Sequence, residues 1–129
     1  MKKILYSFAV LYFLCVSNVY AISGGTEVNP PYSYPWMVEL IKSVKPDHSD
    51  PFCGGVLVSP NQVVTAAHCV KEYSQKDIHA VFNVHNLKTG TVFRVPVSEI
   101  RIHPKFNEDS LDFDAAVLIL ETAVPNFLV

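Results

Sequence analysis

Short apolar runs separated by turn residues divide the chain after residue 21, and no stretch there sustains a helical period. The runs cover residues 36–40, 54–59, 62–65, 78–84, 92–97 and 115–120. Turns at a spacing of roughly 8–12 residues are typical of an antiparallel β-barrel or β-sandwich. The chain is therefore expected to be all-β. The last run is uninterrupted by polar residues, which predicts a strand that is buried on both faces.

The N-terminal segment has the layout of an export signal. Basic residues precede an apolar run over residues 4–16, and a polar pair then leads to Ala21. This order predicts a secretory signal peptide over residues 1–21 that is cleaved after Ala21. A membrane anchor is the alternative, but the run is shorter than the ~20 apolar residues that a spanning helix needs. We therefore expect one domain over 22–129 that is secreted or periplasmic and leaves the membrane after cleavage.

The charge of the exported chain restricts its partners. Loss of Lys2 and Lys3 lowers the ten basic residues to eight against twelve acidic ones, so the formal net charge changes from −2 to −4. No basic patch remains. Nucleic acid and anionic membrane surfaces are therefore not expected as partners.

The cysteines predict one disulfide bond. Cys15 lies in the predicted signal peptide, so Cys53 and Cys69 are the two that remain. In an oxidising compartment, two cysteines most simply pair with each other. A metal site is not expected, because His68 is the only nearby histidine and no second pair of ligands completes a tetrahedral set. We predict no cofactor.

The segment over residues 63–69 is the most distinctive in the chain. A strand is expected to end at Thr65, small Ala66 and Ala67 allow a close turn, and His68 and Cys69 follow. This segment resembles the histidine motif of the trypsin-like (chymotrypsin-fold) serine proteases. Further similarity lies in four other places: Ile22-Ser23-Gly24-Gly25, Pro35-Trp36, Phe52-Cys53-Gly54-Gly55, and Ile102-His103-Pro104 with Phe106-Asn107. The resemblance extends from residue 22 to about residue 125.

The resemblance implies a fold and a set of roles. The fold would be an antiparallel six-stranded Greek-key β-barrel, the N-terminal barrel of a trypsin-like double-barrel domain. Ile22 would be the mature N-terminus, produced directly by signal cleavage because Ala21 precedes it. Cys53 would pair with Cys69, and His68 would act as general base and then general acid.

Asp114 is the expected carboxylate partner of His68. It is followed by an alanine two positions later and by the apolar run, as in the aspartate motif of the family. A carboxylate at this place would hold the imidazole in one tautomer and stabilise its charged form. Asp112 is the alternative candidate, and we expect it to be solvated.

The sequence contains no Gly-Asp-Ser-Gly-Gly segment of the kind that holds the nucleophile in this family. Ser23 is followed by two glycines, but it belongs to the N-terminal motif and is not expected to be the nucleophile. The chain is therefore interpreted as a truncated serine endopeptidase that lacks its second barrel and is inactive by itself, whereas the complete enzyme would cleave protein or peptide substrates. The alternatives are a non-catalytic, secreted binding module and a split protease completed by a second chain.

Other residues are assigned structural places. His48, His79 and His85 are expected at the surface, and His103 is expected to be structural. Trp36 is expected to pack in the core.

Overall fold

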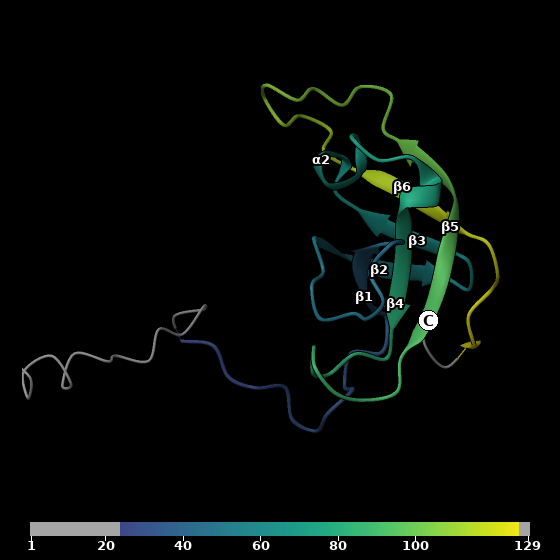
Figure 1. Cartoon of the computed structure of the whole chain (residues 1–129). Coiled ribbons are helices and arrows are strands. Elements are labelled where there is room, and N and C mark those ends of the chain that lie inside the picture. Colours follow the sequence, from purple (N-terminus) through teal and green to yellow (C-terminus); the bar gives the residue numbers. More distant parts are fainter. Residues whose placement is uncertain (1–23, 127–129) are drawn as a thin grey trace, which may run out of the picture.

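Six antiparallel strands form a closed barrel in the computed structural model, which describes residues 24–126 (Figure 1). The strands are β1 (Met37–Lys42), β2 (Cys53–Ser59), β3 (Gln62–Thr65), β4 (Ile78–Phe82), β5 (Phe93–Ile102) and β6 (Ala116–Leu120). Their order around the barrel is β1-β2-β3-β6-β5-β4, and β4 pairs with β1 to close it. The predicted six-stranded barrel is confirmed. The predicted signal peptide over 1–21 and the predicted N-terminus at Ile22 lie outside the described residues.

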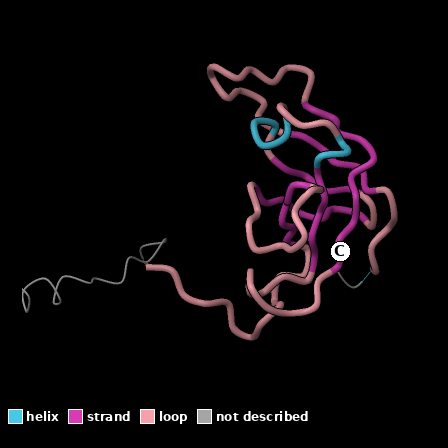
Figure 2. Tube along the Cα trace, viewed as in Figure 1, coloured by secondary structure: helices cyan, strands magenta, loops and turns pink. Residues whose placement is uncertain are grey.

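Two short helices occupy the connection between β3 and β4 (Figure 2). They are α2 (Ala67–Val70) and the 3₁₀-helix η1 (Gln75–Asp77). Neither helix is predictable from the sequence pattern, because segments of three or four residues are too short to display a helical period. Among the described residues, no helix has the length and apolarity needed to cross a membrane.

The barrel interior is filled by alternate residues of every strand, as the two-residue period of a strand requires. In β1, for example, Val38 and Leu40 are buried while Glu39 between them is half-buried. The buried cluster consists of Val38, Leu40, Leu57, Val63, Ala67, Val70, Ile78, Ala80, Phe82, Val95, Val97, Ala116, Leu118, Leu120 and Val124.

The expectation that the last apolar run is buried on both faces is wrong for the described residues. Leu118 and Leu120 are buried in the barrel, whereas Val117 and Ile119 are half-buried on its outside. A closed barrel covers only the inward face of each strand, so the outward face needs a covering from elsewhere.

The expected core position of Trp36 is also wrong. Trp36 precedes β1, is 39 % exposed and packs edge to face against Tyr34, with ring centroids 5.8 Å apart. The residue lies before the first inward-facing position of β1, which is Val38, and therefore outside the packed interior.

Three histidines expected at the surface are half-buried. In His79, Nδ1 accepts a 2.6 Å hydrogen bond from Nε of Arg94. In His48, Nδ1 lies 3.7 Å from a carboxylate oxygen of Glu39. The partial burial of His48, His79 and His85 arises from segments that pack over the outside of the barrel. A strand pattern does not predict such packing.

Candidate active site

The end of β3 and the start of α2 position His68. The hydroxyl of Thr65, the last residue of β3, donates a 2.7 Å hydrogen bond to the carbonyl of Gly54 in β2. Ala67 is fully buried in the core, and the next side chain, that of His68, is 50 % exposed. The strand end and the buried alanine therefore hold the histidine backbone against the barrel while its ring faces outward.

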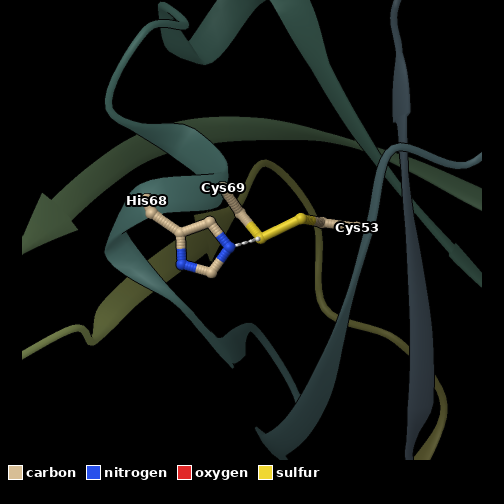
Figure 3. Close-up of side chains that lie close together, drawn as sticks. All are labelled: Cys53, His68 and Cys69. Atoms are coloured by element: carbon tan, nitrogen blue, oxygen red, sulfur yellow. Dashed lines mark hydrogen bonds between the residues drawn. A yellow bond between two sulfur atoms is a disulfide. The ribbon is translucent and has the colours of Figure 1, made fainter. Parts of the chain in front are cut away.

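A disulfide bond joins Cys69 in α2 to Cys53 at the start of β2, as predicted (Figure 3). Their Cα atoms are 6.1 Å apart. Nε2 of His68 lies 3.6 Å from Sγ of Cys69. These three residues bring nitrogen and sulfur atoms together, but thiolate is the form of cysteine that binds metals, and both sulfurs are held in the disulfide.

Asp114 precedes β6 and contacts His68 across a separation of 46 residues. Its Oδ1 accepts a 2.8 Å hydrogen bond from the backbone N–H of His68. Its Oδ2 lies 2.6 Å from Nδ1 of the imidazole. The same carboxylate therefore holds both the backbone and the ring of the histidine, and its side chain is only 20 % exposed.

The hydrogen bond from the backbone N–H of His68 is the main reason that the pKa of Asp114 lies below its ordinary value of 3.8. The hydrogen bond with the imidazole lowers this pKa further, and partial burial opposes both effects. Hydrogen bonds donated to a carboxylate favour its charged form. Asp114 is therefore ionised at neutral pH.

Asp112, the alternative candidate carboxylate, has other hydrogen-bond partners. Asp112 is exposed and accepts a 2.7 Å hydrogen bond from the hydroxyl of Ser110. Its backbone carbonyl accepts a bond from the N–H of Asn107. The structure thus brings His68 together with Asp114 rather than with Asp112.

Sequence reasoning missed the backbone contact of Asp114. The first N–H groups of a helix have no partner within the helix. Ala66, at the N-cap of α2, has no side chain that could accept from them. An alanine at the N-cap indicates that the acceptor for these N–H groups has to come from another part of the chain.

The geometry supports proton transfer at one ring atom. A carboxylate at Nδ1 favours the tautomer with its proton on that atom, which leaves Nε2 able to accept a proton. Among the described residues, no serine hydroxyl forms a hydrogen bond with Nε2. The contact with Asp114 therefore makes Nε2 the ring atom of His68 that can accept a proton.

Comparison with known proteins identifies the family. The family model described as Trypsin matches residues 22–127. The chain is 39 % identical over 105 residues to a trypsin of Saccharopolyspora erythraea, covering 80 % of this chain and 43 % of that protein. It is 35 % identical over 117 residues to a chymase of Macaca fascicularis, covering 87 % of this chain and 44 % of the relative.

A third relative, a chymotrypsin of Phaedon cochleariae, is 33 % identical over 102 residues, with 78 % of this chain and 35 % of the relative covered. The chain thus spans less than half the length of these relatives. The match over residues 22–127, together with the closed six-stranded barrel, shows that the chain belongs to the trypsin-like serine protease family.

Proposed function

We propose that this chain forms the base-bearing half of the active site of a serine endopeptidase that hydrolyses peptide bonds in proteins. His68 is the general base and then the general acid, and Asp114 orients it. The observation that carries this proposal is the 2.6 Å contact between Oδ2 of Asp114 and Nδ1 of His68, made by residues 46 positions apart in the sequence.

The proposed roles follow the proton. Nε2 of His68 takes the proton of an attacking serine hydroxyl as the hydroxyl oxygen bonds to the substrate carbonyl carbon. The imidazolium then gives this proton to the leaving amine as the peptide bond breaks. Asp114 stays ionised throughout and stabilises the imidazolium, a role supported by the lowered pKa of its carboxyl group.

The nucleophile, the oxyanion donors and the specificity pocket would come from a second barrel, since the sequence contains no Gly-Asp-Ser-Gly-Gly segment. Reading the DNA beyond codon 129 in all three frames tests how that barrel is encoded. A Gly-Asp-Ser-Gly-Gly stretch in frame would place both barrels in one chain, and one that is out of frame or after a stop codon would indicate an interrupted protease gene. Its absence, together with robust secretion of the short chain, would favour the non-catalytic binding module.

A chimera tests the catalytic roles directly. Residues 22–127 would replace the matching part of the Saccharopolyspora erythraea trypsin, and hydrolysis of a peptide ester would be measured. We expect activity that falls roughly 10⁶-fold in His68→Ala and on the order of 10⁴-fold in Asp114→Asn, the losses typical of such residues. Both losses should appear in kcat.

Asp112→Asn is the matched control, because Asp112 is a nearby carboxylate that does not contact His68. We expect its kcat to stay close to that of the unmodified chimera. A chimera that folds and forms its disulfide but loses as much activity in Asp112→Asn as in Asp114→Asn would refute the assignment.

Export is part of the proposed function. Cleavage after Ala21 would release a chain beginning at Ile22 into the medium or the periplasm, with no separate activation peptide. N-terminal sequencing of the secreted protein tests this, and a start at any other residue contradicts it.

A further inference from the structure

Phe113, the residue before Asp114, has an unusual backbone conformation. Its φ is 53°, in the left-handed region. A side chain with a Cβ is disfavoured there, and a bulky one especially so. Such conformations persist only where surrounding contacts hold them, and they occur often at functional sites. The contacts of the Phe113 side chain therefore indicate what holds its backbone in this conformation.

The ring of Phe113 makes two contacts. It stacks on the imidazole of His103, with centroids 4.8 Å apart and planes 8° from parallel. The ammonium of Lys105 lies 5.6 Å from its centroid, within the range of a cation–π interaction. The ring is nevertheless 54 % exposed, so it is held by these partners rather than by core packing.

The partners are themselves fixed to the backbone around Asp114. The N–H of His103 donates to the carbonyl of Ala115, at 2.9 Å, and its Nδ1 accepts from the N–H of Lys105, at 3.2 Å. The N–H of Ala115 also donates to the carbonyl of Phe113, at 2.7 Å, which closes a tight turn with Asp114 at its centre. The stack therefore acts on the turn that directs the Asp114 side chain.

We infer that Phe113 is a positioning residue: by stacking on His103 it holds the turn that points both oxygens of Asp114 at His68. This inference rests on the proposed function, because it assigns Phe113 a part in orienting the proposed base. If Phe113 has this role, loss of its stack on His103 should loosen the contact between Asp114 and the imidazole of His68, although both of these residues are still present.

The tautomer of His68 gives a direct readout in the full chain. The ¹⁵N chemical shifts of the His68 ring, measured while its imidazole is neutral, report whether the proton lies on Nδ1 or Nε2. We expect the Nδ1–H form in the natural chain and the Nε2–H form in Asp114→Asn. In Phe113→Ala the ratio of Nδ1–H to Nε2–H should fall about fivefold, the factor that corresponds to one typical net hydrogen bond.

Four further variants separate stacking from the strain of the backbone. Phe113→Trp keeps an aromatic ring and should restore the ratio. Phe113→Asn tolerates the left-handed conformation but cannot stack, so the ratio should fall as in Phe113→Ala while thermal stability is kept. His103→Ala removes the other ring of the stack and should lower the ratio as much as Phe113→Ala does. The fourth variant, which combines His103→Ala with Phe113→Ala, should lower the ratio no further.

Leu111→Ala is the matched control. Leu111 also has a positive φ, of 56°, and is also 54 % exposed, but no aromatic stack involves it. The ratio of Nδ1–H to Nε2–H in Leu111→Ala should equal that of the natural chain. A natural ratio in Phe113→Ala and His103→Ala, or an equal loss in Leu111→Ala, would overturn the positioning role. If Asp114→Asn also leaves the tautomer unchanged, the proposed pairing of His68 with Asp114 fails instead.

Discussion

At the residue scale, the site depends most on Asp114. One oxygen accepts from the backbone N–H of His68 and the other contacts its ring. Because Ala66 offers no capping side chain, the same carboxylate supports the start of α2. Removal of Asp114 should therefore weaken the fold as well as release the imidazole.

The pH dependence of stability should show this contribution. The pKa of Asp114 is lower in the folded chain than its ordinary value of 3.8, so the unfolded chain binds the proton more readily. The carboxylate then stabilises the fold fully above 3.8, and this contribution is lost as the pH falls through the folded pKa. The excess stability of the natural chain over Asp114→Asn should be constant near neutral pH and shrink in acid.

Urea unfolding of both chains from neutral pH to below 3.8 measures this difference. Asp112→Asn is the control. A difference between the natural chain and Asp114→Asn that grows as the pH falls would contradict the assignment.

At the element scale, the β2–β3 hairpin is the rigid support of the site. Gly55 in β2 lies so close to β3 that a Cβ atom there would be 2.7 Å from Cγ1 of Val63 and 2.9 Å from the carbonyl of Val64. The second contact is with backbone, which cannot rotate away. The close approach of the two strands therefore requires glycine at this position, a few residues from the disulfide.

Gly55→Ala should destabilise the barrel by about 1–3 kcal/mol, the usual cost of forcing an extra methyl group into a packed site. Gly54→Ala is the matched control, because a Cβ there meets only the carbonyl of Val38 at an ordinary 3.5 Å. Denaturant unfolding compares the two variants. Equal stabilities would show that the strands can separate at no cost.

The connection between β1 and β2 is attached to the barrel by Arg94 of β5. Its guanidinium donates to the carbonyls of Lys45, at 2.6 Å, and Ser43, at 2.9 Å, and to Nδ1 of His79, at 2.6 Å. Burial lowers the pKa of His79, and the charge of Arg94 lowers it further. A neutral His79 can accept this hydrogen bond, so the three contacts are mutually compatible.

Arg94→Lys should cost about 1.5–3 kcal/mol, because one ammonium cannot reproduce the three directed bonds of a guanidinium. Amide exchange at Ser43, whose N–H donates to the carbonyl of Asp77, should accelerate. Arg101→Lys is the control, since Arg101 is exposed and its side chain pairs with Glu99. Unchanged exchange at Ser43 in Arg94→Lys would show that the connection is held by other contacts.

At the scale of the whole molecule, the outside of the barrel carries an apolar stripe across four strands. Met37 pairs with Val56, Val56 with Val64, and Val64 with Val117, so the four side chains lie in one row. Met37, Val56 and Val64 are 51 %, 40 % and 38 % exposed. The row leads into an apolar hollow of about 250 Å³ lined in part by Val64 and Val117. An exposed apolar surface of this kind favours association.

The chain by itself should therefore associate or be poorly soluble. Val56→Thr with Val64→Thr keeps the shape of the row and makes it more polar, so the fraction of monomer in sedimentation should rise. Val44→Thr is the control, because Val44 is 84 % exposed and lies outside the row. A natural chain that stays monomeric at every concentration tested would contradict this expectation.

The sequence alone determined the strand-rich class, the pairing of Cys53 with Cys69 and the candidates His68 and Asp114. Apolar periodicity and short motifs are local properties, so they can be recognised without knowing which strands are neighbours. The exposure of Trp36 and the half-buried outer face of β6 could not be predicted in this way, because they depend on which surfaces the closed barrel covers.

The tertiary structure alone decided that Asp114 also bonds to the backbone of His68 and that Phe113 stacks on His103. The bond of Asp114 to the backbone of His68 joins residues 46 positions apart, and the stack of Phe113 on His103 joins the two ends of the connection between β5 and β6. The first contact depends on the pairing of β6 with β3, and the second lies beside the pairing of β6 with β5. A sequence pattern records which side chains are present, whereas the distances between them arise from how the strands pair.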